Sequence, residues 1–345
     1  MAYTTINKST SQFNTKLYTG NGGTQSITGV NFRPDWLWIK SRGSTGNHRT
    51  HDVVRGVDKQ IYPNLSNAEY TYSPNTGVTS FDSDGFSLGS DGGQNANTET
   101  YVSWNWKANG AGSANTDGSI NSTVSVNTTA GFSIVKWTGN GVAGASIGHG
   151  LGVVPKMIIV KRLNDTANWT VYHATLGNTH RLELNNETAS TSDAGAWNNQ
   201  TPTTTVFYTG NNLTVGNNGS TYVAYCFAEK TGYSKFGSYT GDGTTDNAFI
   251  YTGFKPTFFM TKRYSDTARW VIWDAVRDPY NNLGRLIYGN EDSAEGGYTV
   301  YLDFMSNGIK ILDGNSKWGA NGSNYIYMAF GQSLVGSNNV PCTAR

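Results

Sequence analysis

The apolar residues of this chain occur in short runs separated by polar turns, a pattern that is typical of β-strands. The run WLWI at residues 36–39 is apolar at every position, as expected for a strand buried on both faces. In YVSWNWKA, which begins at Tyr101, polar and apolar residues alternate, and we expect Val102, Trp104 and Trp106 to face a core. Segments with a helical period are nearly absent. The pattern therefore predicts an all-β protein.

An aromatic-Thr-Gly-Asn/Asp-Gly phrase occurs three times, beginning at Tyr18, Trp137 and Tyr239. Its Gly-Asn/Asp-Gly step supplies the positive φ that a tight turn requires. Other landmarks return in the same order and at nearly the same spacing: a proline before an apolar run, a lysine after that run, and the first residue of a closing strand. They are Pro34, Pro155 and Pro256; Lys40, Lys161 and Lys262; and Tyr101, Tyr222 and Tyr325. This register indicates an internal repeat.

Each repeated unit has about 100 residues, the size of one β-sandwich. We therefore expect three tandem β-sandwich-like repeats, joined in part by a linker that is rich in Gly, Ser and Asn. The sequence leaves open whether each repeat has its own core or all three share one around a pseudo-threefold axis. The expected divisions are a docking arm at 1–12, repeats at 13–110, 131–232 and 233–332, a linker at 111–130 and a tail at 333–345.

The charge balance argues against nucleic acid and anionic membranes as partners. Charged residues are 14% of the chain, against the usual ~25%, and the formal net charge is only +1. Such a chain has no field that would gather nucleic acid or an anionic membrane surface. No apolar run approaches the ~20 residues of a membrane helix. The N-terminal stretch lacks the apolar segment of a secretory signal, so we expect synthesis in a cytoplasm without export.

Candidate catalytic groups do not form a recognisable set. Glu183 with Glu187, or Asp274 with Asp278, are candidate carboxylate pairs for glycoside hydrolysis, but no such pair recurs between the units. The five histidines accompany no nucleophile or metal motif. We therefore expect no enzymatic activity, no catalytic residues and no organic cofactor.

One acidic loop, FDSDGFSLGSDGG at residues 81–93, resembles a calcium-binding turn in its spacing. The candidate ligands are Asp82, Asp84 and Asp91. However, Asp-Gly is also a common hairpin turn, and Asn takes the place of Asp in the corresponding stretches of the other units. A plain turn is therefore the favoured interpretation, with Ca²⁺ as the alternative.

Tryptophan supplies the remaining candidates for a binding site. Most of the 10 tryptophans fall in strand-like runs and are expected in the core. Trp197 and Trp318 instead stand alone in polar loops rich in Gly and Asn. We expect at least one of these two rings to contact a glycan or a neighbouring subunit.

Three stretches resemble a family of virion proteins from marine bacteriophages, often labelled tail fibre or structural protein. They are YTTINKSTSQFNTKLYTGNGGTQSITGVNFRPDWLWIKSR from Tyr3, FDSDGFSLGSDG followed by NTETYVSWNWKANG from Phe81, and YVAYCFAEKTGYSKFGSY from Tyr222. The resemblance implies a multimeric protein of the particle surface without catalysis. It leaves capsid decoration and a compact tail appendage as alternatives.

From this resemblance we expect a homo-oligomer, most simply a trimer, that contacts other virion proteins and contributes to attachment at the host surface. The alternative function is a carbohydrate-binding adhesin, or lectin module, that recognises a host glycan. A glycan-degrading enzyme fits the sequence least well.

Overall fold

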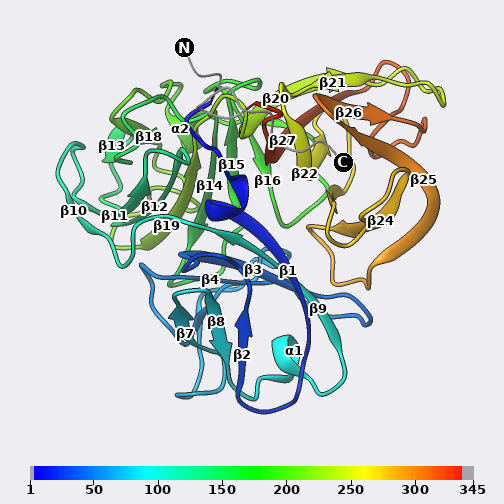
Figure 1. Ribbon diagram of the computed structural model, residues 1–345. Helices are drawn as coiled ribbons and strands as arrows, with labels where there is room; N and C mark the ends of the chain where they lie inside the picture. The colour runs from blue at the N-terminus through cyan, green and yellow to red at the C-terminus, as the bar shows by residue number, and fades with distance from the viewer. Residues whose placement is uncertain (1–3, 336–345) are drawn as a thin grey trace.

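The computed structural model describes residues 4–335, without the side chains of 298–300, and confirms an all-β protein (Figure 1). The described part contains 27 β-strands, two four-residue α-helices and one 3-10 helix. Figure 1 shows three lobes arranged around a common centre. The blue and cyan lobe is the first unit, the green lobe the second, and the yellow-to-red lobe the third.

The first unit is built on a four-stranded antiparallel sheet in the order β1-β9-β3-β4. A smaller sheet, β2-β8-β7, covers one face of it, and β5 pairs with β6 beside it. Its elements are η1 (Ser9–Ser11), β1 (Phe13–Thr19), β2 (Gln25–Thr28), β3 (Trp36–Ser41), β4 (Arg49–Asp52), β5 (Lys59–Gln60), β6 (Tyr70–Thr71), β7 (Val78–Asp82), β8 (Gly85–Leu88), α1 (Gly92–Asn95) and β9 (Thr100–Trp106).

The second unit has a sheet in the order β10-β11-β12-β19-β14-β15-β16-β17, covered by the pair β13-β18. Its elements are β10 (Ser113–Asn115), β11 (Ser122–Asn127), β12 (Phe132–Thr138), β13 (Ala145–Gly148), β14 (Met157–Arg162), β15 (Thr170–His173), β16 (His180–Glu183), β17 (Thr191–Ser192), α2 (Ala194–Trp197), β18 (Val206–Thr209) and β19 (Thr221–Phe227).

The third unit is one curled sheet in the order β20-β27-β22-β23-β24-β25-β26-β21. Its second half, from β24 to β21, folds over the outer face of the first half. Its elements are β20 (Ser234–Thr240), β21 (Phe249–Tyr251), β22 (Lys255–Arg263), β23 (Trp270–Asp274), β24 (Leu283–Tyr288), β25 (Gly296–Met305), β26 (Gly308–Ile311) and β27 (Asn324–Gln332).

The same strand order occurs at the centre of each unit: β1-β9-β3-β4, β12-β19-β14-β15 and β20-β27-β22-β23. In each unit, the strand that ends with the repeated aromatic-Thr phrase pairs with the closing strand. The closing strand pairs on its other side with the strand that begins at or just after the landmark proline. Pro34 and Pro155 precede β3 and β14, and Pro256 is the second residue of β22. This match is what an internal repeat predicts. Close superposition of the three units stays a prediction.

Each central sheet has two buried faces, and the outer face packs within its own unit. In the first unit Ile27 and Phe86 of the small sheet cover Leu37 of β3 and Tyr101 of β9. Corresponding clusters form in the other two units around Trp137 and Phe207, and around Phe259 and Trp273. Each unit is therefore sandwich-like.

The inner faces of the three central sheets meet in one shared core. Trp36 of the first unit stacks on Tyr225 of the second, with ring centroids 4.2 Å apart. Phe13 of the first unit contacts Phe258 and Phe330 of the third. Val102, Trp104, Trp106 and Ala108 face this shared core, as the alternation of β9 predicts. Of the two arrangements that the sequence leaves open, the protein thus has the shared core.

Backbone hydrogen bonds join the units in a closed ring. The amide of Glu69 donates to the carbonyl of Leu163 at 2.7 Å, which links the first unit to the second. Ser190 donates to Tyr264 at 3.0 Å, between the second and third units. Glu295 donates to Arg42 at 2.9 Å and closes the ring between the third and the first. Because the donors and acceptors are equivalent residues, the arrangement is a pseudo-threefold within one chain.

Side chains repeat the same cycle. The indole N–H of Trp169 donates to the carbonyl of Tyr62 in the first unit, and that of Trp270 to the carbonyl of Glu183 in the second. His48 occupies the equivalent place in the first unit and bonds through Nε2 to the carbonyl of Tyr288, at 2.9 Å. His48 Nδ1 accepts from the indole of Trp38, so Nε2 carries the proton. His48 therefore serves the fold.

Two segments differ from the expected divisions. The proposed linker at 111–130 contains β10 and β11, which extend the sheet of the second unit. It is not a free linker, because the edge of β12 offers backbone partners. Within the proposed docking arm at 1–12, Ile6 lies in the shared core at 4% exposure, and the Ser9 amide donates to Gln332 Oε1. This stretch therefore contributes to the core through Ile6 and is more than a docking arm. Residues 1–3 and, in the tail, 336–345 lie outside the described residues.

Candidate functional site

The expectation that Trp197 and Trp318 lack cover from their own units is wrong, because both rings are only 1% exposed. Trp197 ends α2 and packs edge-on against Tyr172, with centroids 5.7 Å apart. Trp318 packs edge-on against Trp273 and Tyr301, at 5.5 and 4.7 Å. Their polar neighbours make turns that fold each ring back over its own outer core. Neither ring offers a surface for a glycan or a subunit.

The three aspartates of the acidic loop are engaged in different contacts. Asp82 accepts from the hydroxyls of Ser80 and Ser87. Asp84 accepts from the amides of Gly29 and Asn31, and these bonds lower the pKa of its carboxyl. Asp91 accepts from the Tyr72 hydroxyl and lies 3.4 Å from the Arg49 guanidinium. Among the described residues no group of three potential metal ligands is found. The contacts favour the plain turn.

The carboxylates weighed for hydrolysis are held by structural partners. Asp274 is fully buried and accepts from Arg277 and from the indole of Trp104 in the first unit. Asp278, four residues later, accepts from two backbone amides of its own loop. Glu183 and Glu187 pair with different arginines, Arg181 and Arg269 respectively. In this structure neither pair faces a common cleft.

Other ionisable side chains are buried as part of the fold. Burial lowers the pKa of His51 to about 3 and that of His173 to about 4, so both are neutral at physiological pH. The landmark lysines are fully buried too. Lys161 donates to the carbonyls of Ser66 and Ala167, and Lys262 to those of Glu187 and Ala268. Lys161 and Lys262 thus each donate a hydrogen bond to a loop of the preceding unit, and these two lysines link neighbouring units.

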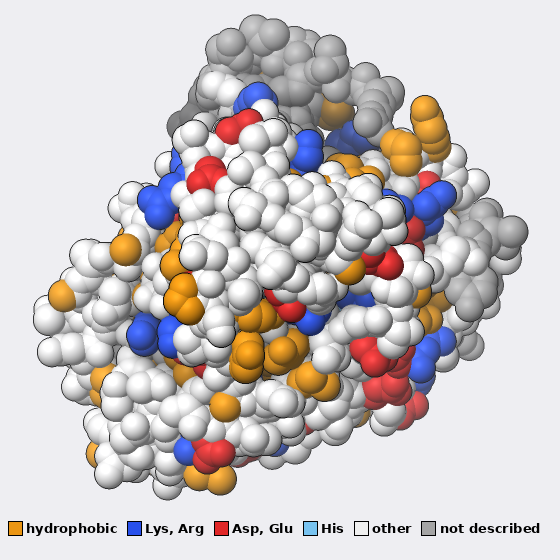
Figure 2. Space-filling model, turned by 90° about the horizontal axis from the view of Figure 1, so that it is seen from below, with side chains coloured by type: hydrophobic (Ala, Val, Ile, Leu, Met, Phe, Trp, Pro, Cys, Tyr) orange, Lys and Arg blue, Asp and Glu red, His pale blue; other side chains and the backbone are white. Residues whose placement is uncertain are grey.

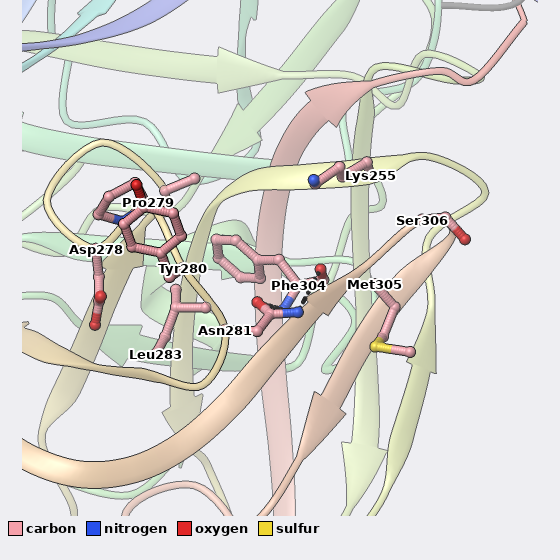
Figure 3. Close-up of a pocket in the computed structure, with 10 residues that line it drawn as sticks. Lys255, Asp278, Pro279, Tyr280, Asn281, Leu283, Phe304, Met305 and Ser306 are labelled. Atoms are coloured by element: carbon pink, nitrogen blue, oxygen red, sulfur yellow. Dashed lines mark hydrogen bonds between the residues drawn. The ribbon is translucent and has the colours of Figure 1, made fainter. Parts of the chain in front are cut away.

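A hollow with a cavity volume of about 640 Å³ lies on the third unit (Figure 3). Its walls come from the loop after β23, the tip of the β25–β26 hairpin and the start of β22. The lining residues are Lys255, Ala275, Asp278, Pro279, Tyr280, Asn281, Leu283, Phe304, Met305 and Ser306. In Figure 3 the rings of Tyr280 and Phe304 lie on the same side of the hollow, and Lys255 lies across from them. This is the candidate functional site.

The walls of this site are held in place by hydrogen bonds. The Asn281 side chain accepts from the Phe304 amide at 3.1 Å and donates to the Phe304 carbonyl at 3.2 Å. Asp278 Oδ2 accepts from the amides of Gly284 and Arg285. Tyr280, by contrast, leaves 80% of its side chain exposed at the rim. The site therefore combines an accessible aromatic ring with positioned polar groups.

A longer loop creates the hollow in the third unit. Thr50 bridges to Ile61, and Val171 pairs with Leu182, eleven positions apart in both units. The equivalent pair in the third unit, Ile272 and Ile287, is fifteen positions apart. The four extra residues lie in the loop that contains the DPYNNLG stretch with Tyr280.

A second, smaller hollow of about 270 Å³ adjoins the first. Lys255 and Ala275 line both, so the two hollows share a wall. The smaller one reaches Asn14 and Thr15 of β1, and it therefore lies between the third unit and the first. Together the two hollows form a groove rather than a single isolated pocket.

Sequence reasoning missed this groove because it searched for features shared by the three units. The signal was available in their differences, since DPYNNLG has no counterpart of equal length in the other units. The rest of the visible surface carries little concentrated charge. Figure 2 shows Lys and Arg side chains and Asp and Glu side chains scattered among uncharged polar groups. None of the helices between residues 4 and 335 has the length and apolar character needed to cross a membrane.

The fold and the groove define an all-β protein of three sandwich-like units closed into a ring, with one unit modified at its surface. The chain belongs to the family described as a domain of unknown function (DUF7483), which it matches over residues 8–333. Comparison with curated proteins gave no match, and comparison with solved structures gave none either.

Proposed function

We propose that this chain is a non-enzymatic bacteriophage virion surface protein, a capsid decoration or a compact tail appendage, that docks on the particle and contributes to host attachment. The proposal rests first on the resemblance of its phrases to virion proteins of marine phages. It rests also on the composition, which is low in charged residues at 14% and has a net charge of only +1, so the chain has no large electrostatic field.

The observation that carries the proposal is the closed ring of units. Three backbone hydrogen bonds at equivalent positions and one shared core hold the units together. Five of the buried ionisable side chains described above also bond across unit boundaries: His48, Lys161, His173, Lys262 and Asp274. Ionisable groups that hold the units together are typical of a structural protein, which acts through its binding surfaces rather than through reactive side chains.

Self-association as a homotrimer remains part of the proposal, as do contacts with other virion proteins. One chain already supplies a threefold arrangement, so the fold itself does not require a trimer. The case for a trimer therefore rests on the symmetry of the particle. Sedimentation of the purified chain tests it directly, because a monomer at all accessible concentrations would contradict it.

Electron microscopy of purified particles labelled with antibody against the chain tests the location. We expect label at regular positions on the head or on the tail, with a fixed copy number per particle. If the chain is abundant in infected cells but missing from purified particles, the proposed virion function is wrong.

A second candidate function is that of a carbohydrate-binding adhesin, and the groove beside Tyr280 is the observation that favours it. The two candidates differ in a simple measurement. An adhesin binds soluble glycan as a purified chain, whereas a purely architectural protein does not.

A further inference from the structure

The third unit exposes aromatic residues where the other two units have small ones. On β21, Phe249 is 49% exposed and Tyr251 is 57% exposed, while Ile250 between them is buried. The equivalent isoleucines, Ile27 and Ile147, are buried in the outer cores of their units. The flanking residues there are Ser26 and Thr28 on β2, and Ser146 and Gly148 on β13.

Comparison of β21 with β2 and β13 shows which of its residues the fold requires. The strand forms in two units with serine, threonine or glycine at the flanking positions, so the fold does not need aromatic rings there. Leaving two such rings in water forgoes the burial from which large apolar side chains stabilise a protein. Exposed aromatic residues that the fold does not need point to an interaction surface.

These rings adjoin the groove through strand pairing. Tyr251 pairs with Gly308 on β26, and Gly308 pairs with Met305 on β25. Opposite residues in antiparallel strands point to the same face of a sheet. The Phe249 ring also lies over Gly308, since a Cβ on that glycine would be 2.6 Å from the ring. Met305 is 42% exposed and lines the larger hollow beside Tyr280. We call Phe249, Tyr251, Met305 and Tyr280 the aromatic strip.

We propose that the groove and the aromatic strip bind an uncharged oligosaccharide. A pyranose ring has an apolar face of C–H groups, which packs on an exposed aromatic ring, and hydroxyls around its edge, which require positioned donors and acceptors. Tyr280 supplies the ring. Asp278 Oδ1, Ser306 and the second N–H of Asn281 supply polar partners, because the internal hydrogen bonds described above use only Asp278 Oδ2 and one amide N–H.

The size and charge of the site specify the ligand further. A hollow of about 640 Å³ lies within the usual ~300–1,000 Å³ range of small-ligand sites. The adjoining hollow of about 270 Å³ extends the groove, so a ligand of more than one sugar ring fits better than a monosaccharide. The larger hollow is lined by one basic and one acidic side chain, Lys255 and Asp278, so it has no net charge that would favour an acidic glycan. A flat apolar protein contact would not need the concave shape or the fixed polar rim.

The inference rests on the proposed role in host attachment and names the part of the chain that performs it. The test is titration calorimetry of the purified full-length chain with neutral tri- to pentasaccharides of glucose, galactose, mannose and N-acetylglucosamine. We expect at least one series to bind. Tyr280→Ala should weaken that binding at least tenfold, and Phe249→Ser with Tyr251→Thr, which copies the first unit, should also weaken it.

Tyr70→Ala is the matched control, since Tyr70 is 51% exposed on β6 of the first unit and lies outside the groove. It should leave glycan binding unchanged, and all variants should keep the melting temperature of the parent chain. If no saccharide of the panel binds, or if Tyr280→Ala and Tyr70→Ala bind as the parent does, the glycan site is refuted.

Particle assays distinguish this failure from failure of the proposed virion function. Variants that enter particles at normal copy number but adsorb less to the host support the glycan site. Variants that fail to enter particles, with saccharide binding intact, show that the strip contacts a virion protein and overturn the glycan site. A chain that binds saccharide but never occurs in particles supports the glycan site and refutes the virion function.

Discussion

The contact between Tyr225 and Asp52 provides a direct test of the closed ring. The Tyr225 hydroxyl, in the second unit, donates to Asp52 Oδ2 in the first at 2.8 Å, and both side chains are fully buried. Burial raises the pKa of Tyr225 well above its usual range, so the hydroxyl keeps its proton at every pH of interest. Tyr225→Phe removes this one donor and keeps the ring that stacks on Trp36.

The expected loss follows from the charge of the acceptor. A hydrogen bond to a charged group stabilises a protein by roughly 1.5–3 kcal/mol. Asp52 keeps its bonds to Arg55 and to the amide of Val54, so its carboxylate is not left without partners. We therefore expect Tyr225→Phe to lower the free energy of unfolding by about 2 kcal/mol.

Urea unfolding followed by both tryptophan fluorescence and far-ultraviolet circular dichroism measures this loss. Because the units share one core, both signals should change in one transition, and the variant should shift its midpoint without splitting it. Tyr280→Phe is the control, since it removes a hydroxyl from an exposed side chain and should change stability by less than about 0.5 kcal/mol. A loss below about 0.5 kcal/mol for Tyr225→Phe, or separate transitions for the units, would refute the ring as a cooperative structure.

Three further substitutions test other parts of the structure. Burial lowers the pKa of Lys161 to about 7, so between about pH 7 and 10 the Lys161 amine is protonated in the unfolded chain and neutral in the folded one. The free energy of unfolding therefore rises with pH over this range. Lys161→Met should flatten this rise, measured as the urea midpoint at each pH. Trp197→Ala should cost about 3–5 kcal/mol of stability by thermal unfolding, and a small loss would contradict its place in the core. Gly85→Ala should cost more than about 1 kcal/mol in the same assay, because φ is 154° and a Cβ would lie 1.8 Å from the Ile27 carbonyl oxygen; a neutral effect would contradict this geometry.

Period-two alternation and glycine-bearing turns were sufficient to predict the all-β fold class. The face of β9 that carries Trp104 and Trp106 was predicted correctly because alternate residues of a strand share a face. The apolar run at residues 36–39 of β3 indicated burial on both sides. A run of this kind does not specify which segment covers each side, so the shared core remained one of two alternatives.

The errors in the candidate site have a common cause. Trp197 and Trp318 have small polar neighbours, a composition that predicts an exposed loop. In the structure the same neighbours form the turn: Asp193 accepts from the Gly195 amide at 2.8 Å at the start of α2. The Tyr239 hydroxyl likewise donates to the Trp318 carbonyl. Polar residues that satisfy backbone groups can hold an apolar ring inside, and sequence composition does not distinguish this from exposure.

Some sequence differences between the units match a difference in the residue that they contact on the neighbouring unit. The buried aspartates Asp52 and Asp274 each pair with an arginine three residues later and with a donor from a neighbouring unit. At the third junction the neighbouring residue is Met328, which cannot donate an N–H or O–H. A buried carboxylate there would lack a partner and would be strongly destabilising. The chain has His173 and Leu176 instead of aspartate and arginine, and His173 bonds to the Tyr327 carbonyl.

That substitution is explained within the chain, because the change on one unit matches the change on the next. The rings of Phe249 and Tyr251 are only partly covered within the chain. The Lys235 ammonium lies 5.4 Å from the centre of the Tyr251 ring and Phe249 lies over Gly308, yet both side chains remain about half exposed. The exchange of aspartate for His173 therefore belongs to the fold. We propose that Phe249 and Tyr251, which remain about half exposed beside the groove, contact the oligosaccharide.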